Sequence, residues 1–175
     1  MGASLFGSFV NIPIWVRSIR VSQPGWRLAG AFVFYRPPQI EHQVLAVNVG
    51  GALVPVVLSL WLLHEAPLWK VAVATAGLAL LTHRIARIVP DEGIAMPVFV
   101  PPLAAAAAGW LLARGGPGID AAAIAYISGS VGTLIGADLS NLGRFSQVGA
   151  GVVSVGGAGV FDGVFLVGIV AALLT

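Results

Sequence analysis

Long apolar runs alternate with short polar segments over most of the 175-residue chain. A helix that crosses a bilayer needs about 20 mostly apolar residues. Five runs approach or exceed that length, and each contains no more than one charged residue. These runs are residues 44–63, 68–82, 94–113, 121–142 and 148–174. The pattern predicts that each run forms a membrane-spanning helix.

The first 43 residues differ from the rest of the chain. Residues 1–16 are apolar but too short to cross a bilayer alone, so we interpret them as a partial first span. Residues 17–43 contain arginines and prolines, and we expect a cytoplasmic loop there, with an interfacial helix around Trp26 to Tyr35. The predicted fold class is all-α, a polytopic transmembrane helical bundle of five to six spans. Residues 1–175 would form a single integral membrane domain, with 44–175 as its five-span core.

The composition favours a bilayer as the partner of this chain. Hydrophobic residues make up 58% of it and charged residues only 9%, whereas a soluble domain carries roughly 25% charged residues. The net charge of +2 comes from nine basic residues that lie mostly between apolar runs. Such charges are typical of membrane topology signals, so we expect no nucleic-acid partner. The absence of cysteine excludes disulfides and thiolate catalysis.

Basic residues lie between alternate apolar runs. Four arginines fall in residues 17–43, two follow the second run, and Arg144 follows the fourth. The intervening turns carry little positive excess. Because basic loops stay on the cytoplasmic side, this distribution predicts a cell-membrane protein with arginine-rich loops in the cytoplasm and the C-terminus outside.

Asp138 and Asp162 are the two acidic residues inside the predicted spans. A carboxylate at mid-membrane costs at least about 2.5–3.5 kcal/mol on insertion scales, so each needs a partner or a function. Two carboxyls that share a proton can activate water for peptide hydrolysis. They could equally relay protons or bind a cation. The structural alternative is that Asp138 caps or snorkels at its helix end and that Asp162 lies in the first turn of a helix.

Glycines and amides surround these acids in the sequence. Three glycines in residues 156–159 predict a broken or re-entrant segment before the last helix, which would bring Asp162 to the depth of Asp138. Asn141 follows Asp138 on the same side of its helix. Gly132 and Gly136 recur at a spacing that lets helices approach closely. We therefore predict four substrate-binding residues beside the acids: Asn48, Asn141, Gly157 and Gly159. Three scattered histidines predict neither a metal site nor a cofactor.

Four blocks of sequence resemble a family described as domain of unknown function 1614, a group of small multi-pass membrane proteins. The blocks are residues 7–13 (GSFVNIP), 48–55 (NVGGALVP), 126–139 (YISGSVGTLIGADL) and 154–166 (SVGGAGVFDGVFL). The resemblance covers nearly the whole chain. It implies a membrane protein but supplies no activity.

A looser likeness connects the two acids to intramembrane aspartic proteases of the presenilin, signal peptide peptidase and prepilin peptidase type. Those proteins place two aspartates on neighbouring helices, the second in a Gly-x-Gly-Asp motif. Here Gly157 and Gly159 precede Asp162, with two residues intervening, and Ala137 precedes Asp138. The likeness implies that Asp138 and Asp162 are catalytic and that the substrate is a membrane-embedded peptide. The alternatives are a small proton- or cation-coupled transporter or channel, and a non-catalytic membrane subunit.

Overall fold

The computed structural model describes residues 2–20, 25–29, 32–36, 40–89, 93–113, 119–147, 151–157, 166, 167 and 170. Its N-terminal part is mostly extended. The elements there are α1 (Gly2–Gly7), β1 (Asn11–Arg20), β2 (Gly25–Ala29), β3 (Phe32–Arg36) and β4 (Ile40–Asn48).

Helices dominate the middle of the chain. A π-helical turn, η1 (Val49–Leu53), leads directly from β4 into α2 (Val54–Leu62). The later elements are η2 (Leu63–Glu65), α3 (Leu68–Ile85), β5 (Arg87–Val89), β6 (Gly93–Ala95), α4 (Val100–Leu112), α5 (Ile119–Thr133), the π-helical turn η3 (Leu134–Asp138), η4 (Leu139–Gln147) and β7 (Gly151–Val155).

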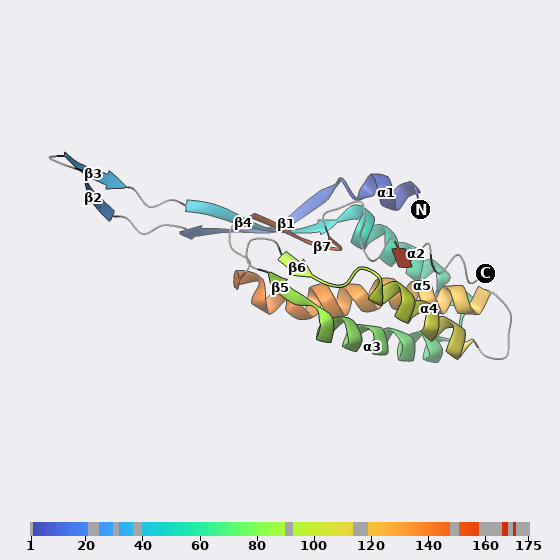
Figure 1. Cartoon of the computed structure of the whole chain (residues 1–175). Helices are drawn as coiled ribbons and strands as arrows, with labels where there is room; N and C mark the ends of the chain where they lie inside the picture. The colour runs from blue at the N-terminus through green and yellow to red at the C-terminus, as the bar shows by residue number, and fades with distance from the viewer. Residues whose placement is uncertain are drawn as a thin grey trace.

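The three-stranded sheet has the order β1-β4-β7. Strand β1 pairs antiparallel with β4, which sets Asn11 opposite Asn48. Strand β7 pairs parallel with β4, which sets Val155 opposite Val47. Figure 1 shows this sheet on one side of helices α3, α4 and α5, with the β2–β3 hairpin extending away from them. Because β4 and β7 are parallel, their C-terminal residues lie at the same end of the sheet.

The predicted all-α bundle of five to six spans is wrong. Strands occupy much of the first 48 residues and residues 151–155. In the described part of the chain, one helical stretch, Asp120–Arg144, is long and apolar enough to cross a bilayer, and Val49–Glu65 and Val100–Leu112 are shorter apolar helices. The physical reason is that β-branched apolar runs of five to ten residues suit a strand as well as a helix, and pairing with distant strands decides between them.

The errors fall at particular segments. The interfacial helix expected around Trp26 to Tyr35 is the β2–β3 hairpin, and the partial span expected in residues 1–16 divides into α1 and β1. The run 148–174 includes β7 rather than a continuous helix. By contrast, α3 covers the run 68–82, and the helical stretch from α5 to η4 covers the run 121–142.

Small residues hold α5 and η3 close to α3 and α4. A Cβ on Gly136 would collide with the backbone oxygen of Ala79 and with Thr82 Oγ1. The Thr82 hydroxyl lies 2.8 Å from the backbone oxygen of Leu78 in its own helix and 3.2 Å from the backbone oxygen of Gly132, within hydrogen-bonding distance of both. A Cβ on Gly109 of α4 would lie 2.4 Å from the backbone oxygen of Ala121. The glycine spacing on this helix therefore serves close helix packing, as the sequence predicts.

Candidate functional site

Two π-helical turns lie next to the end of the sheet where β4 and β7 terminate. The first, η1, begins after Asn48, and the second, η3, ends at Asp138. Ala52 of η1, Leu134 of η3 and Val155 of β7 pack in one buried cluster. Isolated π-helical turns are rare and occur frequently at functional sites. This convergence, from three distant parts of the chain, defines the candidate site.

Asn48 links the start of the chain to η1. Its side chain is 1% exposed. Oδ1 accepts a hydrogen bond from the Gly51 backbone N–H at 2.7 Å and so caps η1. Nδ2 donates to the backbone oxygen of Ser8 at 2.7 Å and to Asn11 Oδ1 at 3.0 Å. Asn48, which the sequence predicts to bind substrate, therefore makes these hydrogen bonds to other parts of the protein.

Asn11 and Ser4 extend this network. Ser154 Oγ, on β7, donates to Asn11 Oδ1 at 2.6 Å. Ser4 Oγ donates to the backbone oxygen of Gly50 at 2.5 Å. The Gly50 Cα touches the α1 backbone so closely that any Cβ there would collide with it. Residues from three of the four sequence blocks, 7–13, 48–55 and 154–166, thus meet in one polar network. The sequence singled out the blocks but gave no sign of their pairing.

Asp138 is half-buried at the end of η3. Its Oδ2 accepts a hydrogen bond from the Gly156 backbone N–H at 2.7 Å. Gly156 and Gly157 adopt positive φ angles of 87° and 75°, which favour glycine. A Cβ on Gly156 would lie 2.6 Å from the Ala52 nitrogen and from the Gly51 carbonyl carbon. Gly156 therefore fits between Asp138 and η1, and the only sequence signal for this role is its place in the last glycine-rich block.

Two of the other residues predicted to bind substrate, Asn141 and Gly157, make hydrogen bonds within the chain. Asn141 is buried, and its Nδ2 donates to the backbone oxygen of Ala137 at 2.8 Å, within its own helical segment. The Gly157 N–H donates to the backbone oxygen of Ser154 at 3.1 Å and closes the turn after β7. Gly159 and Asp162 lie outside the described residues. Asp138 is therefore the member of the predicted catalytic pair that the structure describes.

Two apolar cavities adjoin the site. One of about 360 Å³ reaches Leu139 and Val155, the residues that follow Asp138 and precede Gly156. A larger one, of about 630 Å³, lies between α2, α3 and α5. The two share Val56, Val131 and Ile135 in their walls. Among the described residues, no three His, Asp or Glu side chains lie close enough together to hold a metal ion.

Comparison with known proteins gives one match. A family model described as "Protein of unknown function (DUF1614)" matches residues 5–174. No curated protein and no solved structure is significantly similar to the chain. The matched range contains nearly every residue of the polar network and all of both cavities.

Proposed function

This chain belongs to the family of proteins of unknown function DUF1614. We propose that this member is a membrane-embedded aspartic-type endopeptidase with Asp138 as a catalytic carboxyl. One observation carries the proposal. The hydrogen bond from the Gly156 N–H to Asp138 Oδ2 fixes a carboxyl at the end of an edge β-strand. That position suits an acid that acts on the backbone of an extended peptide.

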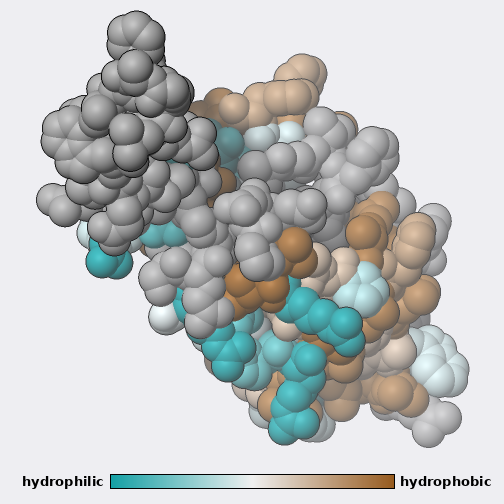
Figure 2. Space-filling model, turned by 60° about the vertical axis from the view of Figure 1, so that its left-hand side comes forward, coloured by the Kyte–Doolittle hydropathy of each residue, from teal (hydrophilic) through white to brown (hydrophobic). Residues whose placement is uncertain are grey.

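The outer faces of the helices support a membrane location. Trp61 of α2, Trp69 of α3 and Trp110 of α4 are each at least 60% exposed. Leucines and valines of the same helices are similarly exposed, and Figure 2 shows hydrophobic residues over much of one face of the molecule. A water-soluble surface rarely carries so much contiguous apolar area. At about 1.5 Å per residue, the 25 residues of the helical stretch Asp120–Arg144 span about 37 Å, enough to cross the roughly 30 Å hydrocarbon core of a bilayer.

Strand β7 offers a backbone edge to a peptide. It lies at one end of the strand order β1-β4-β7, so β4 pairs with one of its edges, and no other described strand pairs with the opposite edge. Val152 on this strand is 60% exposed. Extended peptides bind such edges by adding a strand. A peptide paired in this way would carry its backbone toward the end of β7, where Gly156 holds Asp138.

The chemistry requires a second carboxyl, and we assign it to Asp162. Gly156 fixes Oδ2 of Asp138, and Oδ1 accepts no hydrogen bond from the part of the chain that the structure describes. One carboxylate would take a proton from water while the other, protonated, hydrogen-bonds the scissile carbonyl. The water oxygen then bonds to the carbonyl carbon, the C–N bond breaks, and a proton passes to the departing amine.

Apolar cavity walls favour a peptide over an ion as the substrate. The smaller cavity, which reaches Leu139, is lined by aliphatic side chains, and so is the larger one apart from Ser59 and Thr75. An ion path would need polar groups to replace the hydration shell. Apolar walls instead suit the side chains of a membrane peptide.

The decisive experiment measures cleavage of membrane peptides by purified protein in lipid. Helical substrates would be incubated with wild type, Asp138→Asn, Asp162→Asn and Asp120→Asn. Asp120, at the start of α5, is the control because it is an acid on the same helix far from η3. Cleavage by wild type and Asp120→Asn alone is the expected result. Cleavage that survives either other substitution rules out the pair, and proton or cation flux without cleavage would indicate transport.

A further inference from the structure

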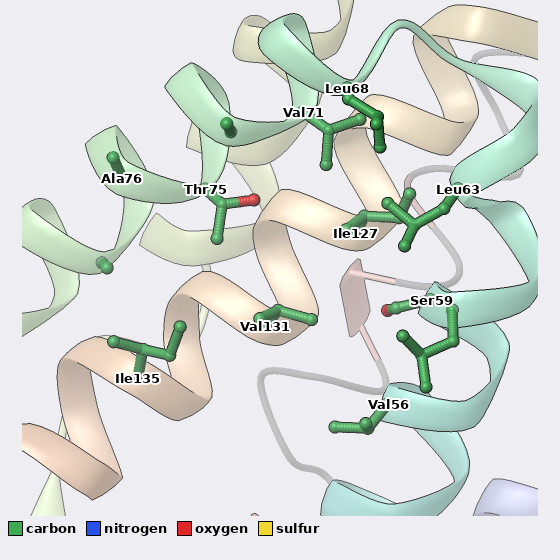
Figure 3. A pocket seen from close by; sticks show the side chains of 13 residues that line it. Val56, Ser59, Leu63, Leu68, Val71, Thr75, Ala76, Ile127, Val131 and Ile135 are labelled. Atoms are coloured by element: carbon green, nitrogen blue, oxygen red, sulfur yellow. The ribbon is translucent and has the colours of Figure 1, made fainter.

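A groove between α2 and α3, with α5 as its floor, is not explained by the residues of the candidate site. We call it the α2–α3 groove, and it corresponds to the cavity of about 630 Å³. Figure 3 shows side chains from all three helices facing the same space. Its walls include Ser59, Leu63, Val71, Thr75, Ile127 and Val131.

Two hydroxyls in this groove lack partners. Ser59 Oγ and Thr75 Oγ1 are buried atoms with no hydrogen bond from the described residues, and Ser59 is only 3% exposed. In Figure 3 both oxygen atoms point into the space between the helices. A buried hydroxyl without a partner is unfavourable and calls for an explanation. Rotation of either side chain toward the groove would let its hydroxyl bond to an occupant that carries hydrogen-bonding groups.

Small residues line the α3 side of the groove. Ala72, Ala76 and Ala79 all face it, together with Thr75. Rows of small residues at this spacing allow a second helix backbone to approach closely in a membrane, where hydroxyls can also bond across the interface. A lipid acyl chain would fill the space but could not pair with the two hydroxyls. The groove chemistry therefore selects a helix over a hydrocarbon chain.

The groove leads to the candidate site. The smaller cavity continues it, because the two share Val131 and Ile135, and extends as far as Val155. The helical stretch that lines the two cavities runs from Ile127 to Leu139, and its twelve-residue rise is about 18 Å long. That length accommodates roughly three turns of a docked helix.

We propose that the α2–α3 groove docks the helix of the membrane peptide that is cleaved, an inference that rests on the proposed endopeptidase function. The bound peptide is an apolar helix with small or hydroxyl-bearing residues on the docked face. It leaves helical form beyond the groove and continues as an extended strand along β7. Selection of substrates would then depend on Ser59 and Thr75 as well as on the residues near Asp138.

Photo-crosslinking tests docking without requiring cleavage. A photoreactive amino acid would replace Ala76, inside the groove, or Gly77, whose added Cβ meets nothing within 4 Å. Both proteins would carry Asp138→Asn, so a bound peptide stays intact. The probe is a labelled Leu/Ala helix of about 20 residues with serines on one face, in phosphatidylcholine vesicles. We expect crosslinks from position 76 and about tenfold fewer from position 77, as a one-sided helix contact requires.

A groove-filling variant gives an independent measurement. Ala76→Leu should weaken peptide binding by about tenfold or more, the scale of an overpacked contact, whereas Gly77→Leu should leave binding unchanged. Crosslinking from position 76 only to lipid, or only to a second copy of the chain, would overturn the proposal. Equal crosslinking at the two positions would do the same. If the peptide docks at the groove but wild type does not cleave it, the endopeptidase function is rejected and docking is not. If cleavage is as fast in Ala76→Leu as in wild type, docking at the groove is rejected and the endopeptidase function is not.

Discussion

The backbone N–H of Gly156 lies 2.7 Å from Oδ2 of Asp138, although 18 residues separate the two in sequence. This hydrogen bond joins the end of strand β7 to the end of the π-helical turn η3. Gly156 is also wedged against η1, since a Cβ there would collide with Ala52. The position of the carboxyl therefore depends on a glycine that has no chemistry of its own.

Gly156→Ala should both destabilise the protein and disturb Asp138. The φ angle of 87° is strained for alanine, and the new Cβ would lie 2.6 Å from two backbone atoms of η1. We expect a loss of roughly 1–3 kcal/mol in the free energy of unfolding. Gly151→Ala is the matched control, because its φ of 132° is also positive but its Cβ meets nothing. Equal losses measured for the two variants would contradict the steric argument.

Asn48→Ala should be among the more damaging polar substitutions. It removes three hydrogen bonds, including the cap on the Gly51 N–H, from a buried side chain. With each bond contributing about 0.5–1.5 kcal/mol, we expect a loss of roughly 2–4 kcal/mol in the free energy of unfolding. Ser154→Ala, which removes one bond to Asn11, should cost clearly less. Denaturation of both variants in the same detergent measures the difference, and equal losses would refute the assigned network.

Gly136→Ala should separate α3 from η3. The added methyl would collide with the backbone of Ala79 and with the Thr82 hydroxyl, so we expect a loss of about 1–3 kcal/mol. Gly77→Ala, on α3 itself, has open space around its new Cβ. It should be neutral or stabilise by up to about 1 kcal/mol, because alanine favours helix. Thermal unfolding of the pair checks the prediction, which fails if Gly136→Ala is tolerated as well as Gly77→Ala.

Leu103→Lys tests the membrane location of the helices. Leu103 is 64% exposed on α4 and lines neither cavity, so a lysine there would be harmless in water. Facing lipid, it should oppose insertion by about 2.5–3.5 kcal/mol. The measurement is the fraction of protein that resists alkaline extraction from membranes. Glu65→Lys, at the end of η2, is the control and should extract like wild type. Identical extraction of Leu103→Lys and wild type would argue against lipid contact at this face.

The sequence by itself identified α3 and the helix that carries Asp138, because long apolar runs with small residues in helical spacing have few alternatives. It also marked Asp138, since an acid in such a run needs an explanation. The close approach at Gly132 and Gly136 followed from the same spacing. These features are local, so the residues around each position are enough to predict them.

Tertiary structure alone decided the rest. Residues 11–20 and 151–155 form strands because β4 supplies partners from distant parts of the chain, and short apolar runs do not reveal their partners. The same pairing brings Asn11 to Asn48 and Ser154, and it sets Gly156 against Asp138. Asn48 caps η1, and its predicted part in substrate binding stays a prediction. Asp162 lies outside the described residues, so its pairing with Asp138 stays a prediction. Hydrogen bonds across long sequence separations depend on strand register, and register is fixed only when the whole sheet assembles.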